Sequence, residues 1–299
     1  MLLFQNCETL QFNFKNHIKM NITKKTKILL IGLLIIISSN SFSQITLKTP
    51  NTESVLYLGK GENQPLIVGL GGSEGGNAWT SDYWKKTRDQ FIEKGYAFLA
   101  IGYFGSKGTP DTLNKISINN VHDAIMVATE NRKINKRKIA IVGGSRGGDL
   151  ALLIGSYFKD IKCVVAIVPS HVAFPGHTNH FTTSAWSFNN AELPFVPVNE
   201  ESVPYLMKRD LRGAFTAMLK DSIAEANALI KVEKINGPIL MLSATKDDHI
   251  PGVEMCNKMI ERLKVSRFKY VNKHVIIEGG HGEPLNHFDL IFKFLEANF

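Results

Sequence analysis

The residue best placed for chemistry in this sequence is Ser145, which stands in the run Gly-Gly-Ser-Arg-Gly-Gly at 143–148. Residues 138–142 before it have the apolar pattern of a strand, and residues 149–154 after it belong to a helical pattern. A tight strand-to-helix turn holds a nucleophile in strained geometry, and its neighbours must be small because chain segments approach closely. The pattern predicts a nucleophilic serine. The alternative is a glycine-rich turn that only packs the helix or binds phosphate.

A serine hydroxyl needs a base to remove its proton, and His281 is the histidine best placed for that task. It stands between glycines, directly after the apolar run 274–277, which predicts a strand. Asp247 and Asp248 likewise follow a predicted strand, at 239–243. A carboxylate there could orient the imidazole and stabilise its charged form. The chain order of serine, acid and histidine, each on a loop after a strand, is typical of hydrolases with such a turn.

We predict a catalytic triad of Ser145, Asp247 and His281. Asp247 is favoured as the acid because it is the first of the pair. Asp248 is the alternative acid, and its other expected role is to cap the helix predicted from residue 252.

Two backbone N–H groups are predicted to bind the negative charge that develops on the substrate oxygen. Arg146 follows the nucleophile at a helix N-terminus, so its N–H points into an anion site. The second donor is expected in the glycine-rich run 69–76 after another predicted strand, with Leu70 or Gly71 as the candidate. A P-loop is excluded there because no Lys-Ser or Lys-Thr follows the glycines.

Short apolar runs alternate with amphipathic stretches from residue 54 onward. The predicted strands are 54–58, 66–70, 97–101, 138–142, 164–168, 239–243 and 274–277, and the predicted helices lie near 80–94, 116–131, 146–158, 252–264 and 286–298. Several strands are continuously apolar, which is typical of strands buried on both faces. The sequence therefore predicts a doubly wound, mostly parallel α/β sheet in one domain over residues 44–299.

Residues 171–237 interrupt this alternation with proline- and aromatic-rich segments and a helical stretch at about 205–230. Long insertions over the carboxyl ends of strands usually shape a binding site. We therefore predict a cap that covers the pocket. A surface excursion without substrate contact is the alternative.

The other histidines and the cysteines imply no metal or cofactor. Packing, surface or pocket-lining roles are expected for four histidines outside the predicted triad: His122, His171, His177 and His180. His249 could line the site from the acid loop. Cys163 and Cys256 are expected to be buried, and their spacing fits no zinc motif.

The N-terminus has the order of basic residues, short apolar core and small residues that describes a secretory signal peptide. Three lysines between 24 and 27 precede the apolar run 28–37, and a serine-rich segment ends at residue 43. The apolar run is shorter than the about 20 residues that span a bilayer. We expect residues 1–43 to be a signal peptide, with Met20 as an alternative start, and the mature protein to be periplasmic or secreted. An uncleaved anchor, the alternative, would be its only membrane contact.

The composition, with 44% hydrophobic residues in 299, suits one globular domain with a large core. Residues 1–43 hold five lysines and one glutamate, so their removal lowers the net charge from +8 to +4. No basic run with interleaved aromatic residues remains. We therefore predict no nucleic acid partner.

Together these motifs resemble the C-terminal catalytic domain shared by acyl-CoA thioesterases and bile acid-CoA:amino acid N-acyltransferase, a family with the α/β-hydrolase fold. The likeness covers roughly residues 54–299, and Asp247-Asp248 and Gly280-His281 fall where that family places its acid and base. It rests on Gly-Gly-Ser-Arg-Gly-Gly-Asp-Leu-Ala-Leu (143–152), Ser-Ala-Trp-Ser (184–187), Leu-Pro-Phe-Val-Pro (193–197) and Val-Glu-Lys-Ile-Asn-Gly-Pro-Ile-Leu (232–240). Dienelactone hydrolases are more distantly similar.

The resemblance implies a serine hydrolase that cleaves a small-molecule carboxylic ester or thioester through an acyl-enzyme, without a cofactor. The N-acyltransferase of the family uses a cysteine nucleophile, whereas Ser145 favours transfer to water. Two alternatives are an acyltransferase that passes the acyl group to an amine or alcohol, and a non-catalytic binding protein on a hydrolase scaffold. Export would separate the protein from cytosolic acyl-CoA, so the resemblance supports the mechanism better than the substrate.

Overall fold

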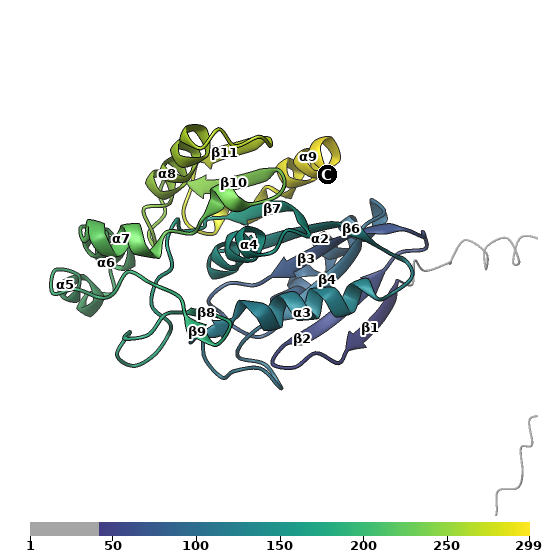
Figure 1. Ribbon diagram of the computed structural model, residues 1–299, viewed down its shortest axis with the longest axis horizontal. Coiled ribbons are helices and arrows are strands. Elements are labelled where there is room, and N and C mark those ends of the chain that lie inside the picture. Colours follow the sequence, from purple (N-terminus) through teal and green to yellow (C-terminus); the bar gives the residue numbers. More distant parts are fainter. Residues whose placement is uncertain (1–41) are drawn as a thin grey trace, which may run out of the picture. The chain divides into compact units, whose positions relative to one another are not determined.

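An eight-stranded sheet forms the centre of the computed structural model, which describes residues 42–299 (Figure 1). In spatial order its strands are β1 (Ser43–Leu47), β2 (Glu53–Leu58), β4 (Ala97–Gly102), β3 (Gln64–Leu70), β6 (Ile134–Gly144), β7 (Ile161–Ile167), β10 (Ile239–Ala244) and β11 (Asn272–Ile277). The pairings from β4 to β11 are parallel, while β1 and β2 pair antiparallel at one edge. The predicted mostly parallel α/β sheet is confirmed.

Helices cover both faces of this sheet, as the doubly wound pattern predicted (Figure 1). The larger helices are α2 (Asp82–Glu93), α3 (Ile118–Thr129), α4 (Arg146–Tyr157), α8 (Gly252–Val265) and α9 (Phe288–Asn298). Side chains of α3, α4 and α8 pack in one core with Leu66 and Val68 of β3, and side chains of α2 and α9 pack in a second core with Ile67. The alternation follows because successive side chains of a strand point to opposite faces.

The register of the parallel strands brings three loops to one edge of the sheet. Gly144, at the end of β6, pairs with Ile167 on β7, and Leu242 on β10 pairs with that same residue. Ala244, at the end of β10, pairs with Ile277 at the end of β11. The loops that follow β6, β10 and β11 therefore leave the sheet side by side, which is where ligands bind in open α/β sheets.

Residues 171–237, the predicted cap, contain two short strands and three short helices. They are β8 (Trp186–Phe188), β9 (Ala191–Glu192), α5 (Val203–Met207), α6 (Leu211–Met218) and α7 (Ser222–Ala228), and β8 pairs with β5 (Ile116–Ser117). The 3-10 turn η2 (Val232–Lys234) also lies in this segment, whereas η1 (Ala78–Thr80) and η3 (Glu283–Asn286) lie outside it.

The helical stretch expected at about 205–230 is present, and it consists of three short helices. Asp210 accepts the N–H of Gly213 at 2.8 Å, and Asp221 accepts that of Ala224 at 2.9 Å. Each aspartate caps a new helix, so two breaks divide the stretch.

The predicted signal peptide, residues 1–43, lies outside the described residues except for its last two positions. Ser43 begins β1 and pairs with Leu58. Between residues 42 and 299, no helix has both the length and the apolar character needed to cross a bilayer. Cys163 and Cys256 are buried and free, as expected.

Gly237 provides a test of how tightly the cap joins the sheet. A Cβ there would lie 2.0 Å from the carbonyl oxygen of Lys162 at the start of β7. We expect Gly237→Ala to lower the free energy of unfolding by about 1–3 kcal/mol, because backbone must move to admit the methyl group. Urea denaturation measures the effect. Gly61→Ala is the control, since its nearest contact is a side-chain carbon of Gln64 at 3.9 Å, and an equal loss in both variants would contradict the explanation.

Candidate active site

Ser145 forms the turn between the end of β6 and the start of α4, with backbone angles φ 52° and ψ −122°. A positive φ is strained for a residue with a side chain, and it is the geometry that the glycine-rich run predicted. The Ser145 N–H donates to the carbonyl oxygen of Ile167 on β7 at 2.8 Å, which fixes the turn to the sheet. The serine lines a cavity at this edge.

Two glycines of this turn are required because other backbone atoms come too close for a side chain. A Cβ at Gly143 would lie 2.0 Å from the carbonyl oxygen of Gly147, and a Cβ at Gly147 would lie 2.3 Å from that of Gly71. Any larger residue would push the helix from the strand or from the loop after β3. The close approach brings that loop beside the turn.

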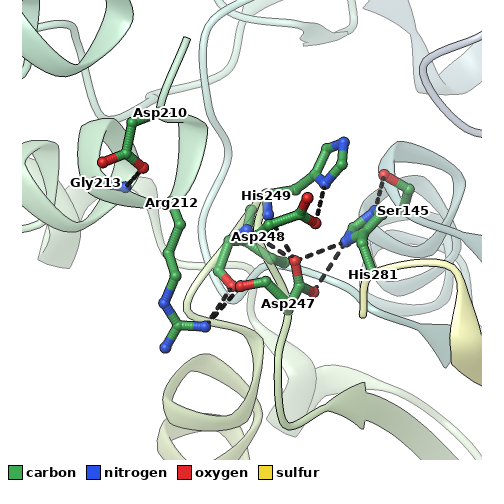
Figure 2. Close-up of polar contacts among 9 residues, drawn as sticks. Ser145, Asp210, Arg212, Gly213, Asp247, Asp248, His249 and His281 are labelled. Atoms are coloured by element: carbon green, nitrogen blue, oxygen red, sulfur yellow. Dashed lines mark hydrogen bonds and ion pairs between the residues drawn. The ribbon is translucent and has the colours of Figure 1, made fainter. Parts of the chain in front are cut away.

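The structure brings Ser145, Asp247 and His281 into one line of hydrogen bonds (Figure 2). The Nε2 atom of His281 lies 3.1 Å from the Ser145 Oγ, and its Nδ1 atom lies 2.9 Å from each carboxylate oxygen of Asp247. The three side chains come from the loops after β6, β10 and β11. Such a line allows the imidazole to take the serine proton while the carboxylate stabilises the resulting charge.

The Asp247 carboxylate is buried, with 1% of the residue exposed, and several donors hold it. Its Oδ1 atom accepts the N–H groups of His249 and Ile250 at 2.9 Å and 3.0 Å. Arg212 donates to its backbone carbonyl at 2.7 Å (Figure 2). Burial raises the pKa of Asp247, but the hydrogen bond and charge of His281 and the backbone donors outweigh it and hold the pKa below its usual value. Asp247 is therefore ionised at neutral pH.

Asp248 contacts a different histidine. Its Oδ1 atom lies 2.8 Å from the Nδ1 atom of His249, and of the two candidate acids it is Asp247 that contacts His281. The helix-capping role expected for Asp248 is wrong, because α8 begins after Pro251 without a side-chain hydrogen bond at its N-terminus.

The three predicted oxyanion donors occupy different positions. Arg146 is the first residue of α4, where helix geometry leaves its N–H without a partner inside the helix. Leu70 is the last residue of β3 and pairs with Ile101 on one side and Gly143 on the other. Gly71, the first residue beyond the strand, is therefore the better placed of the two candidates in this loop.

Gly72, which follows the two candidate donors in the same loop, is a further neighbour of the serine. A Cβ at Gly72 would lie 3.2 Å from the Ser145 Cβ, so the two backbones are in close contact. Its N–H donates to the Glu74 Oε1 atom at 3.0 Å. The glycine-rich run 69–76 marked the loop, but spacing alone could not say which glycine approaches Ser145.

A cavity of about 160 Å³ opens beside Ser145, and His249 and His281 also line it. Apolar side chains from residues 171–237 form much of its wall: Phe174, Phe181, Leu206, Leu211, Phe215 and Met218. These residues come from the predicted cap, so the cap forms part of the cavity beside Ser145.

Arg146 and Asp149 form a polar pair on the wall of this cavity, which the sequence reasoning did not assign. The Arg146 guanidinium donates to the carbonyl oxygen of Pro175 at 3.1 Å and lies 3.5 Å from the Asp149 carboxylate. It stands 5.9 Å from the ring centres of Phe174 and Phe215, within the range of cation–π attraction. The spacing of three residues between Arg146 and Asp149 on one helix is the feature of the sequence that indicates their contact.

Burial raises the pKa of Asp149 to about 6, although the Arg146 charge and hydrogen bonds from Ser170 oppose the shift. The backbone N–H of Ser170 donates to the Asp149 Oδ1 atom at 2.7 Å. Burial therefore disfavours the charged form of this carboxylate relative to its protonated form.

Two of the remaining histidines have packing roles, as expected. His122 contacts Asp160 at 2.8 Å and stacks on Phe158, and His171 contacts Glu225 at 2.6 Å. His177 lines the cavity, and His180 is exposed.

Within residues 42–299, one group of side chains has donor atoms close enough together to hold a metal ion. It consists of Asp247, His249 and His281, whose donor atoms lie within 4.8 Å of one another. The facing atoms of Asp247 and His281 are already joined by hydrogen bonds. We therefore interpret the group as a hydrogen-bonded site.

Comparison with known families agrees with this geometry. The model of the family described as BAAT / acyl-CoA thioester hydrolase C terminal matches residues 116–283, more than half of the chain. The chain belongs to this family. A second model, of α/β hydrolases of unknown function, matches residues 43–185. The family resemblance inferred from the sequence is thus confirmed.

The curated relatives are distant and longer. Acyl-coenzyme A thioesterase 1 of Rattus norvegicus is 25% identical over 171 residues, which cover 57% of this chain and 38% of that protein. Acyl-coenzyme A amino acid N-acyltransferase 1 of Mus musculus is 23% identical over 170 residues, with the same coverage. The chain spans less than half the length of either relative.

Solved structures share the fold. An esterase from Pyrococcus furiosus matches with a TM-score of 0.57 and 16% identity, covering 87% of this chain and 94% of that one. The acylaminoacyl peptidase of Pyrococcus horikoshii matches with a TM-score of 0.58 and 13% identity, covering 89% of this chain and 43% of that one. The chain therefore has the α/β-hydrolase fold.

Asp149 should make the stability of the protein depend on pH. Because its pKa is about 6 in the folded state and 3.8 ordinarily, the folded protein binds a proton between these values that the unfolded chain does not. The free energy of unfolding of the wild type, relative to Asp149→Asn, should rise as the pH falls from 7 to 4, by at most about 3 kcal/mol. Urea denaturation of both proteins across this range tests it. A constant difference would contradict the buried-carboxylate explanation.

Proposed function

We propose that this protein is a serine hydrolase that cleaves carboxylic esters or thioesters through an acyl-enzyme formed on Ser145. The observation that carries the proposal is the continuous contact from the Ser145 Oγ through His281 to the buried, ionised Asp247. The membership of a thioester hydrolase family and the hydrolase relatives support it independently.

In the first step, His281 takes the Ser145 proton at Nε2 while Oγ attacks the acyl carbonyl. Asp247 holds the Nδ1–H and stabilises the imidazolium. The tetrahedral oxyanion is bound by the N–H of Arg146 and by a second N–H from the Leu70–Gly71 segment. His281 then gives its proton to the leaving oxygen or sulfur, and the acyl-enzyme is formed.

In the second step, a water molecule takes the place of the leaving group. His281 removes its proton, hydroxide attacks the acyl carbonyl, and Ser145 leaves with the proton that His281 returns. The product is a carboxylic acid, and no cofactor or metal enters either step.

The substrate class follows from the cavity. Its aromatic and aliphatic wall, supplied by residues 171–237, favours an apolar acyl chain over a strongly polar one. The thioesterase relatives are named for acyl-coenzyme A, so coenzyme A thioesters belong in a substrate screen beside simple esters.

The proposal predicts that Ser145→Ala abolishes turnover. Loss of the nucleophile should reduce kcat by at least about 10³-fold, because triad members act as a unit. We would measure hydrolysis of p-nitrophenyl esters of graded chain length and of acyl-CoAs, with and without amine or alcohol acceptors. Full activity of the variant would show that Ser145 is not the nucleophile. An amide or transferred ester as the main product would instead show an acyltransferase, and absence of fluorophosphonate labelling of Ser145 in the wild type would favour a binding protein.

We also propose that the protein is exported. The basic, apolar and serine-rich order of residues 24–43 supports this proposal. Expressed with its N-terminus, the protein should be recovered from the periplasm or medium with a new N-terminus near residue 44. Mass spectrometry of the recovered chain measures the cleavage point. Recovery of only the uncleaved chain in the cytosol would contradict export.

A further inference from the structure

A second histidine lies directly against the proposed base. The ring of His249 stacks on the ring of His281, with centroids 4.3 Å apart and planes inclined by 23°. Both residues line the cavity beside Ser145. The proposed mechanism uses His281 alone, so His249 is a titratable aromatic group in the site without an assigned role.

His249 is itself held in position from two directions. Its backbone N–H donates to the Asp247 Oδ1 atom at 2.9 Å, and its Nδ1 atom lies 2.8 Å from the Asp248 carboxylate (Figure 2). The first contact fixes the backbone beside the acid, and the second fixes the ring. The sequence Asp-Asp-His at 247–249 thus provides one carboxylate for each of the two stacked imidazoles.

His281 has reason to need such support. It is flanked by glycines, and the hydrogen bonds from Lys246 to Gly279 and from Glu283 to Gly280 hold the backbone of this loop but do not contact the imidazole ring. The contacts of Nδ1 and Nε2 hold the ring at its edge, and hydrogen bonds at the edge do not contact the ring faces. The stacked ring of His249 covers one of these faces.

We propose that His249 is a positioning residue that holds the imidazole of His281 in line between Asp247 and Ser145, with Asp248 fixing the His249 ring. The inference rests on the proposed function of Ser145 and His281. In this proposal Asp248 holds the ring of His249, as Asp247 holds the ring of His281. His249 acts through His281, by ring contact, and takes no part in bond making or proton transfer.

The test compares His249→Ala with His249→Phe. Removal of the ring should lower kcat about 10- to 100-fold with little change in KM, because a misplaced base slows chemistry more than binding. Phenylalanine retains a flat ring for stacking and should restore kcat to within about threefold of the wild type. The rate of fluorophosphonate labelling of Ser145 should fall in His249→Ala and recover in His249→Phe, as kcat does. This rate depends on the serine and its base and does not require that a substrate chain bind in the cavity.

A double-mutant cycle tests the part of Asp248. Asp248→Ala alone should lower kcat, but less than His249→Ala, and it should have no further effect when His249 is already alanine. His287→Ala is the matched control, because this histidine is similarly exposed and pairs with Glu283 outside the cavity. Melting temperatures identify any variant whose loss of rate comes from unfolding. His249→Phe remains informative in that case, because its ring preserves the packing.

The outcomes separate the two proposals. Wild-type kcat and labelling in His249→Ala would overturn the positioning role, and so would a His249→Phe variant as slow as His249→Ala. Additive losses in the cycle would overturn the assignment of Asp248 to His249. Wild-type activity in the Ser145→Ala variant would overturn the proposed function, and the role of His249 with it.

Discussion

The strained backbone of Ser145 is the constraint on which the rest of the site depends. A backbone conformation with φ 52° costs a residue with a side chain about 1–3 kcal/mol of folding free energy. Such a conformation persists only where the surrounding structure fixes it. Here the fixing contacts are the hydrogen bond to Ile167 and the close backbone approach at Gly143 and Gly147. The same contacts draw the loop after β3 toward the start of α4. The geometry that presents the serine therefore also gathers the backbone N–H groups that we propose for the oxyanion.

Parallel strand pairing explains how residues about a hundred positions apart meet Ser145. Because β6, β7, β10 and β11 run in the same direction and end in register, their following loops share one edge. Asp247 and His281 need only short loops to reach the serine. This is why the sequence could predict their proximity from two features, an apolar run and the polar loop after it.

The features that the sequence could not predict lack an apolar run or depend on particular side-chain contacts. The edge strand β1 has mostly exposed residues, so it lacks the apolar run that identified the others. The helical part of the cap breaks at Asp210 and Asp221, where each side chain caps a new helix. The stacking of His249 on His281 joins two loops whose relative rotation no spacing rule gives. Asp149 lies in the predicted helix, and its spacing from Arg146 permits their pairing, but the sequence does not show that the carboxylate is buried and bonded to Ser170.

Arg146 shows how the cap and the serine turn are joined. Its backbone begins α4 directly after Ser145, while its guanidinium lies 5.9 Å from the ring centres of Phe174 and Phe215 and donates to the carbonyl oxygen of Pro175, all three in the cap. A displacement of the cap would therefore displace Arg146, the first residue of α4, whose N–H we propose as an oxyanion donor. The charge of Asp149 compensates that of Arg146 at the point where an apolar cavity would otherwise bury a lone cation. The buried pair is thus best understood as the attachment that fixes the cap over the serine, and the raised pKa of Asp149 is the electrostatic cost of placing it there.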